Sequence, residues 1–302
     1  MRRAVAIVSS LVASALVVAL PAGGAPIRAP YHGAVKANKS AARVLLLLDQ
    51  PYALDGSPAH TFDAYLPADG ETTHPGIVLI HGGGWSHGSK QDLAGEARYF
   101  ALHGFDAFSI NYRLAPRHRW PAQLLDAEAA VVWLRTYAPR YALDPNRIGA
   151  FGPSAGGHLA SFLAVLTNGN PDRGAGVKAA VAWSAPMDLR LLIQLAGAPS
   201  ANSKKVFACG STAECESLAL LASPIHYVSR DDANLFFVHA KWERMSVKVA
   251  REMDSRMKQV HARHVYVELP TSKHARGYQY EDVPGTSTTV LDASLDFFST
   301  YL

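Results

Sequence analysis

The stretch Arg147-Ile148-Gly149-Ala150-Phe151-Gly152-Pro153-Ser154-Ala155-Gly156-Gly157-His158-Leu159-Ala160 decides the fold of this chain. Residues 148–151 form a short apolar run that is typical of a buried parallel strand. The pattern Gly-x-Ser-x-Gly follows, and the Ala-rich apolar residues 159–166 then predict a helix. A strand, a tight turn with serine at its apex and a helix form a nucleophile elbow, which projects the serine hydroxyl above the sheet.

The residue types around Ser154 suit this turn. Gly152 and Gly156 lack Cβ atoms, so the strand and the helix can pack closely on either side of the serine. Pro153 keeps Gly152 extended as the strand ends. The helix amino terminus offers free N–H groups and a positive dipole end, which suit an oxyanion. The pentapeptide alone would also fit an ordinary glycine-rich turn, so the rest of the chain must decide.

Strands and helices alternate along the chain from residue 76 onward, which indicates a mainly parallel, doubly wound α/β sheet of about eight strands flanked by helices. A length of 302 residues, with 49% apolar and 18% charged residues, suits such a globular domain. Residues 60–66 alternate apolar and polar side chains, as an antiparallel edge hairpin does. The expected strands are 44–49, 60–66, 76–81, 105–110, 148–151, 177–183, 235–240 and 264–269, and the expected helices are 91–103, 121–137, 159–166, one containing residues 249–260, and 288–301.

Residues 1–25 have the pattern of a secretory signal peptide, which leaves residues 26–302 as the mature domain. Two arginines precede an uncharged apolar run over 4–20, and small residues then allow cleavage after Ala25 or Ala22. An uncleaved anchor helix is the competing interpretation, but the run is at the lower edge of a membrane span. We therefore expect a secreted protein without a stable membrane anchor, in the extracellular or the periplasmic and cell-wall space.

The net charge excludes one class of partner. The whole chain carries +4, and loss of the two arginines at positions 2 and 3 leaves a nearly neutral mature protein. No run of lysine or arginine indicates nucleic-acid binding. The sequence leaves the oligomeric state open.

One long segment, residues 189–223, interrupts the alternation between two expected strands. It contains weak helical patterns and both cysteines of the chain, Cys209 and Cys215. In an oxidising compartment two cysteines so close together are expected to form a disulfide, and a zinc pair lacks a second pair of ligands nearby. We expect a small, disulfide-stapled partial cap over the carboxyl edge of the sheet, with a mobile surface loop as the alternative.

The second chemical motif is His81-Gly82-Gly83-Gly84-Trp85, which directly follows an expected strand. Its glycines allow successive N–H groups to point into one space. Together with the N–H of Ala155, these groups could bind the oxyanion of a tetrahedral intermediate. The pairing of this motif with Gly-x-Ser-x-Gly is far more specific than either motif alone.

A serine nucleophile needs a base, and the base needs an orienting carboxylate. His274 lies in the loop after the last expected strand, where it could reach back over the sheet. Glu243 follows the strand before it and is favoured as the acid, with Asp188 as its rival. Glu243 could instead be a surface residue that opens a helix. His261 and His264 are expected to be solvated, and His239 to be packed.

These residues resemble the α/β-hydrolase superfamily, and within it the secreted His-Gly-Gly-Gly-Trp carboxylesterases that include BD-FAE-like and hormone-sensitive-lipase-like enzymes. The matching stretches are 76–85, 111–116, 151–160 and 222–224, within a resemblance that covers about residues 45–300. The resemblance implies Ser154 as nucleophile, His274 as base and Glu243 as acid. It also implies that Gly83, Gly84 and Ala155 line the oxyanion hole. Members usually carry His-Gly-x-x-Asp before the acid, whereas this chain has Ala240 and Glu243.

The expected function is a serine carboxylesterase that hydrolyses short- to medium-chain esters, small or polysaccharide-linked, without metal or organic cofactor. A polysaccharide acetyl or feruloyl esterase and an arylformamidase-like amidase would use the same residues. A catalytically inactive binding module is a distant alternative, because it would be expected to lose the serine, the histidine or the glycines. Trp85 and Trp242 either line the substrate pocket or simply pack, and Asp126 is expected to make only a structural contact to a loop.

Overall fold

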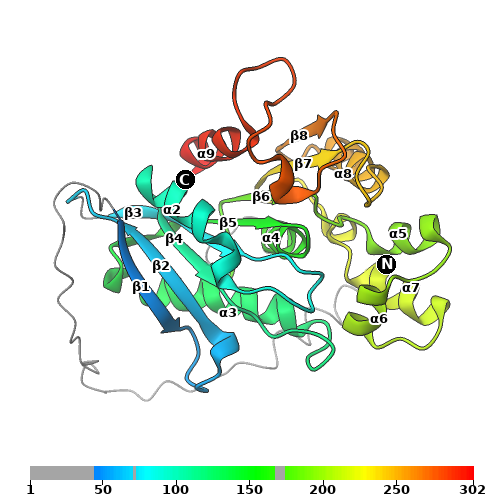
Figure 1. Ribbon diagram of the computed structural model, residues 1–302, viewed down its shortest axis with the longest axis horizontal. Coiled ribbons are helices and arrows are strands. Elements are labelled where there is room, and N and C mark those ends of the chain that lie inside the picture. The colour runs from blue at the N-terminus through cyan, green and yellow to red at the C-terminus, as the bar shows by residue number, and fades with distance from the viewer. Residues whose placement is uncertain (1–43, 71–72, 167–173) are drawn as a thin grey trace. The chain divides into compact units, whose positions relative to one another are not determined.

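A mixed sheet lies at the centre of the computed structural model, which describes residues 44–70, 73–166 and 174–302 (Figure 1). Within these ranges the sheet has eight strands in the order β1-β2-β4-β3-β5-β6-β7-β8. They are β1 (Val44–Pro51), β2 (Thr61–Pro67), β3 (His74–Ile80), β4 (Asp106–Ile110), β5 (Leu143–Pro153), β6 (Ala179–Trp183), β7 (Asn234–Ala240) and β8 (His264–Leu269). The pairs β1–β2 and β2–β4 are antiparallel, and all other neighbours are parallel. The predicted sheet, including its antiparallel edge, is confirmed.

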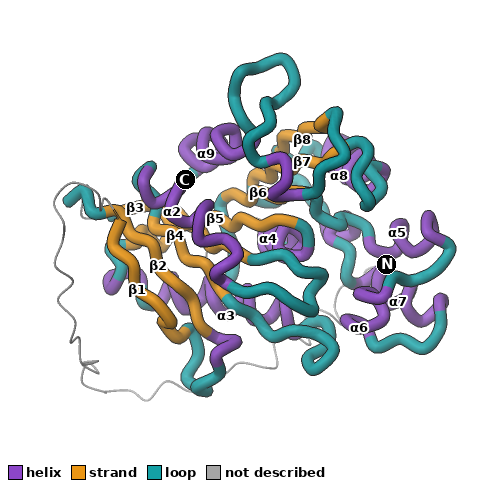
Figure 2. The backbone as a smooth tube through the Cα atoms, viewed as in Figure 1, coloured by secondary structure: helices purple, strands orange, loops and turns teal. Residues whose placement is uncertain are grey.

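Helices cover both faces of the sheet, as Figure 2 shows. The helices are α2 (Ala94–Leu102), α3 (Ala122–Thr136), α4 (Ala155–Val165), α5 (Leu189–Ala196), α6 (Ala201–Phe207), α7 (Thr212–Leu221), α8 (Lys248–Gln259) and α9 (Val290–Tyr301). Side chains of α3, α4 and α8 share one apolar cluster with one face of the sheet. Side chains of α2 and α9 share a second cluster with the other face.

The central strand β3 shows why the sheet is covered on both sides. Ile77 and Leu79 belong to the cluster of α2 and α9, whereas Val78 and Ile80 belong to the cluster of α3 and α4. Successive side chains of a strand point to opposite faces, so a continuous apolar run needs a helical layer on each face.

The chain divides into two units, Met1–Ala42 and Arg43–Leu302. The first unit lies outside the described residues, and so does the predicted signal peptide of residues 1–25. None of the helices in the described ranges combines the length and the hydrophobicity that a membrane crossing requires.

Strand β2 is buried on both faces, including the face that carries its polar side chains. Asp63 is buried, and its carboxylate accepts hydrogen bonds from the buried Lys90 ammonium and from the N–H of Asp49 (2.9 Å). Lys90 begins a short 3-10 turn (Lys90–Leu93) ahead of α2, where a helix from residue 91 was expected. The alternation in the sequence therefore reflects an ion pair inside the fold rather than a solvent-facing side.

Other boundaries also differ from the predicted ones. Helix α4 begins at Ala155, immediately after the serine, and strand β5 begins five residues before the expected apolar run. Helix α6 was not predicted, because Ala201–Phe207 lacks an apolar period. It begins at a serine cap, where the Ser200 hydroxyl accepts from Ser203 N–H (3.1 Å).

The buried ion pair gives a prediction for stability. Asp63→Ala leaves the Lys90 ammonium without its buried partner and should lower the free energy of unfolding by about 3 kcal/mol in urea titrations. Asp49→Ala removes an exposed partner of the same ammonium and should cost less than about 1 kcal/mol. Equal losses in the two variants would contradict this account.

Candidate active site

Ser154 lies at the turn between β5 and α4, at the carboxyl edge of the parallel strands. Its φ of 53° and ψ of −119° are strained for a residue with a side chain. The N–H of Ser154 donates to Trp183 O (2.7 Å), and its carbonyl accepts from His158 N–H (3.0 Å) as α4 begins. Both backbone groups are thus fixed by neighbouring elements.

The glycines beside Ser154 are required by close backbone contacts. A Cβ at Gly156 would lie 1.8 Å from Ile80 O, and one at Gly152 would lie 2.3 Å from the carbonyl carbon of Gly156. No side chain fits at either position, so the sequence-based reason for these glycines is confirmed. Their absence of side chains lets α4 approach β3 and β5 directly.

The glycine-rich loop after β3 lies beside the serine. A Cβ at Gly82 would stand 3.6 Å from Ser154 Cβ. Gly83 and Gly84 have positive φ values of 108° and 57°, which favour glycine. Among the described residues, no hydrogen bond to another protein group uses the N–H of Gly83, Gly84 or Ala155. These three donors are available to a ligand at this edge of the sheet.

Two buried histidines hold the walls of this loop in place. The His81 ring stacks on Tyr112, with 4.2 Å between ring centroids, and its Nδ1 lies 2.7 Å from Gly82 O. His158 receives a hydrogen bond from Trp85 Nε1 at Nδ1 (3.3 Å), and its Nε2 lies 2.7 Å from Ala222 O. Burial lowers the pKa of both histidines to about 4, so both rings are neutral and serve as structural connectors.

His274 and Glu243 meet across the loops that follow β8 and β7. Nδ1 of His274 donates a hydrogen bond to Oε2 of Glu243. Nε2 of His274 is buried and has no hydrogen-bond partner within the described part of the chain. The expected base and the favoured acid are therefore in contact. The second ring nitrogen of His274, Nε2, is available to a group outside the protein.

The Glu243 side chain is buried rather than on the surface. Burial alone would raise the pKa of its carboxyl, but the hydrogen bond from His274, the nearby His239 and the hydrogen bond from Ser184 outweigh it. The pKa of Glu243 consequently lies below its ordinary value, and the carboxylate stays ionised at neutral pH.

The rival acid, Asp188, is used elsewhere. It is the N-cap of α5, where its Oδ1 accepts from Leu191 N–H (2.8 Å). Asp126 forms hydrogen bonds with the Arg113 guanidinium and with Arg113 N–H (2.8 Å), as expected of a structural contact to a loop.

Three other expectations have mixed outcomes. His239 is buried, as expected, with Nε2 3.2 Å from Met245 O. His261 is exposed, as expected, but the prediction of a solvated His264 is wrong. Its side chain is largely buried, with Nε2 2.9 Å from Asp254 Oδ1. Trp242 does not line the candidate cavity and is 59% exposed, with Lys241 Nζ 5.3 Å from its ring centroid.

Ser154 and His274 line one cavity of about 670 Å³. Trp85, the three loop glycines and Ala155 border it, so Trp85 is both packed and part of the wall. One wall is apolar and comes mainly from α5 and its flanks: Pro186, Leu189, Leu192, Ile193, Ala196, Ala198 and Met245. Polar groups also line the cavity: His87, Asp92, Ser200, Asn202, Ser203, Arg244 and Arg276.

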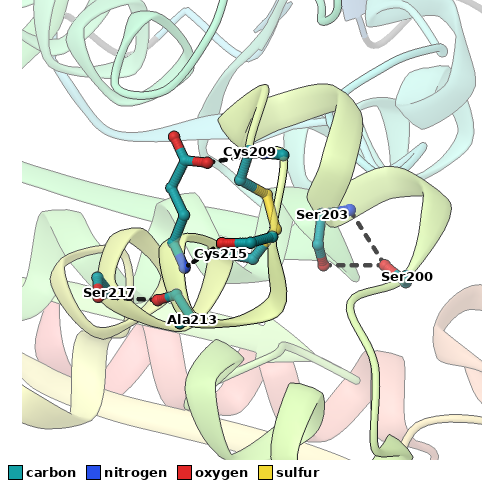
Figure 3. The surroundings of a disulfide bond; sticks show 9 residues. Ser200, Ser203, Cys209, Ala213, Cys215 and Ser217 are labelled. Carbon is teal, nitrogen blue, oxygen red and sulfur yellow. Dashed lines mark hydrogen bonds between the residues drawn. A yellow bond between two sulfur atoms is a disulfide. The ribbon is translucent and has the colours of Figure 1, made fainter.

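Helices α5, α6 and α7 form the segment that was expected to be a partial cap, and α5, α6 and the turn between them supply much of this lining. Figure 3 shows the Cys209–Cys215 disulfide that joins the end of α6 to the first turn of α7. The backbone of α6 is also tied to the body of the domain, because Trp120 N–H donates to Val206 O (2.9 Å). The expected disulfide is present, and residues 189–221 form helices.

No cluster of histidine, cysteine and carboxylate side chains in the described ranges could hold a metal ion.

Two polar residues of the site region were missed in the sequence. Ser184 follows β6 and contacts Glu243, and Asn202 of α6 lies against Gly84, where an added Cβ would be 2.1 Å from Asn202 Nδ2. The position of Ser184 at the carboxyl end of a buried strand was a usable signal. Asn202 had none, because it stands in an unpredicted helix.

Comparison with known proteins agrees with this geometry. The sequence profile of the BD-FAE family matches residues 62–254. The chain is 32% identical over 279 residues to the probable carboxylic ester hydrolase LipM of Mycobacterium tuberculosis, covering 84% of this chain and 61% of LipM. It is 41% identical over 117 residues to the esterase LipC of the same organism, covering 38% of this chain and 28% of LipC. The chain thus spans less than two thirds of the length of these relatives.

A solved structure of similar extent also matches. A truncated carbohydrate esterase from gut microbiota superimposes with a TM-score of 0.73 and 26% identity, covering 85% of this chain and 96% of that chain. The α/β-hydrolase fold that the sequence motifs implied is confirmed by this match.

The contacts of the elbow predict a sharp contrast between two glycines. Gly156→Ala should abolish folding or lower the melting temperature by more than 10 °C, because its Cβ would collide with Ile80 O. Gly95→Ala in α2 meets nothing within 4 Å and should be neutral or stabilising by about 0.5–1 kcal/mol. Thermal melts followed by circular dichroism compare the two, and an unchanged melting temperature for Gly156→Ala would refute the close-packing argument.

Proposed function

The chain belongs to the BD-FAE family, and on that premise we propose that it is a secreted serine carboxylesterase with the triad Ser154, His274 and Glu243. One observation carries the proposal: a strained serine and a histidine paired with a buried carboxylate line the same cavity. The substrates proposed are short- to medium-chain carboxylic esters. Secretion is inferred from the signal pattern of residues 1–25.

Acylation begins with attack of Ser154 Oγ on the ester carbonyl carbon. The hydroxyl proton passes to Nε2 of His274, the ring nitrogen without a protein partner. Glu243 accepts from Nδ1–H, which fixes the tautomer and stabilises the imidazolium that forms. Collapse of the intermediate expels the alcohol, which takes its proton from His274, and leaves the acyl group on Ser154.

The negative charge of the tetrahedral intermediate needs donors at the same edge. We assign this role to the N–H groups of Gly83, Gly84 and Ala155, which have no protein acceptor among the described residues. One such donor is typically worth about 3–4 kcal/mol of transition-state stabilisation. Water activated by His274 then hydrolyses the acyl-enzyme through the same groups.

The apolar and polar parts of the lining suggest how an ester is oriented. The acyl group is assigned to the apolar wall of α5, and the alcohol to the side of Arg244, Arg276 and Asn202. This polar side also suits a sugar, so a polysaccharide acetyl or feruloyl ester is the second candidate, favoured by the likeness to a carbohydrate esterase. An arylformamidase-like amidase would use the same catalytic groups, and amide substrates test it.

Substitutions separate the proposed catalytic residues from their rival. Ser154→Ala and His274→Ala should each lower kcat/KM on p-nitrophenyl butyrate by at least about 1,000-fold, because the residues act as a unit. Glu243→Gln should lower it by about 100-fold or more, whereas Asp188→Asn should change it less than about threefold apart from a small loss of stability. Near-normal turnover by Glu243→Gln together with loss in Asp188→Asn would transfer the acid role to Asp188.

Acyl-chain preference is set by α5 in this proposal. Ile193→Ala removes a buried side chain from the apolar wall and should raise kcat/KM for p-nitrophenyl octanoate relative to butyrate by about tenfold, since each buried methylene is worth about 0.8 kcal/mol. Leu195→Ala, on the exposed side of the same helix, is the matched control and should leave the ratio unchanged. An unchanged ratio in both variants would remove α5 from the acyl site.

A further inference from the structure

The side chain of Ser184 touches both halves of the proposed acid–base pair. It is buried directly after β6, and its Oγ lies 2.7 Å from Oε1 of Glu243. The same oxygen lies 3.0 Å from the N–H of Ala275, the residue after His274, and 3.0 Å from Tyr278 Oη. One hydroxyl therefore joins the loop after β7 to the loop after β8.

The direction of these hydrogen bonds follows from the chemistry of the groups. An ionised carboxylate can only accept hydrogen bonds, so the Ser184 hydroxyl donates its single proton to the hydrogen bond with Glu243. One lone pair then accepts from Ala275 N–H, and the other faces Tyr278 O–H. Tyr278 O–H also faces Val238 O (3.0 Å), whose other lone pair accepts from Ser184 N–H (2.8 Å), so the Tyr278 proton is shared between two acceptors. Every hydrogen-bonding position of the Ser184 hydroxyl therefore faces a protein group.

The two carboxylate oxygens of Glu243 contact different groups. Oε1 faces Ser184 Oγ, His239 Nε2 (3.1 Å) and Ala240 N–H (3.3 Å). Oε2 is left for His274 Nδ1. A glutamate has one more rotatable bond than an aspartate, and each free bond loosens the orientation of the carboxylate. The donors on Oε1 remove that freedom.

The backbone supports the same conclusion. Ser184 and Ala275 have φ values of 47° and 49°, in the left-handed region that residues with side chains rarely adopt. Both residues are buried, and the Ala275 N–H to Ser184 Oγ bond connects them. Such strained conformations persist only where many contacts with the surrounding structure hold them, and they cluster at functional sites.

We propose that Ser184 is a positioning residue, whose hydroxyl fixes Glu243 and the backbone after His274 so that Oε2 faces Nδ1. The inference rests on the proposed function, in which Glu243 is the acid and His274 the base. Ser184 itself does not touch the substrate, because its hydroxyl is fully used by protein partners. The titratable groups around Glu243 are His239, His274 and Tyr278.

Ser184→Gly is the sharpest test, because glycine adopts a φ of 47° without strain and removes only the side chain. On p-nitrophenyl butyrate we expect kcat to fall about 10- to 100-fold with KM within about twofold, the effect of a lost hydrogen bond to a charged group. Glu243 loses a donor that favours its ionised form, so the acid limb of the kcat/KM profile should move to higher pH.

Ser294→Ala is the matched control. Ser294 is also buried, and its hydroxyl accepts from Trp183 Nε1 (3.1 Å) and donates to Val290 O (2.7 Å), away from Glu243 and His274. The control should lose stability comparably but keep the wild-type kcat and pH profile. A wild-type kcat and pH profile in Ser184→Gly would overturn the proposal, as would the same loss of kcat in Ser294→Ala.

A second measurement separates this proposal from the proposed function. The proton on His274 Nδ1 gives a downfield resonance in ¹H NMR that reports its bond to Glu243. It should move upfield or broaden in Ser184→Gly and stay in place in Ser294→Ala. An unchanged resonance in Ser184→Gly refutes the positioning role even if no ester is hydrolysed, whereas absence of ester hydrolysis by the wild type refutes the proposed function alone.

Discussion

The close approach of α4 to the backbone of β3 and β5 is the constraint on which the rest of the site depends. A carbonyl oxygen of β3 stands where a Cβ of Gly156 would be, so the first turn of α4 can lie there only because residue 156 has no side chain. Because the helix starts within one residue of the strand end, the backbone of Ser154 alone makes the turn from strand to helix. The strained φ of Ser154 thus follows from the close packing of strand and helix at Gly152 and Gly156, the glycines on either side of it.

The carboxyl edge of the parallel strands gathers the remaining groups at this point. The glycine loop follows β3, Ser184 follows β6, Glu243 follows β7 and His274 follows β8. Each loop carries one chemical group, and each is held by buried partners from a neighbouring loop rather than by its own strand. Four residues with side chains, Trp85, Ser154, Ser184 and Ala275, have positive φ values here. The two apolar clusters on either side of the sheet supply the rigidity that holds these conformations.

The sheet and the elbow could be predicted from the sequence because they depend on local patterns. Apolar runs of strand length, the glycines around Ser154 and the cysteine spacing all act within a few residues. Features that depend on distant partners could not be predicted in this way. The burial of Asp63 needs Lys90 from another segment, and the burial of His264 needs Asp254. Trp242 could equally have lined the pocket or packed, but in the fold it does neither, because its side chain is exposed and lies outside the cavity lining.

Covalent trapping of the nucleophile tests the central claim most directly. Folded protein would be treated with a fluorophosphonate, and the adduct located by intact mass and peptide mapping, with urea-unfolded protein and Ser154→Ala beside it. The account predicts a single adduct on Ser154 in the folded protein and none in the other two samples, because only the assembled site activates the hydroxyl. An adduct on another residue, or none on folded protein, would contradict the assignment of this cavity as a serine hydrolase site.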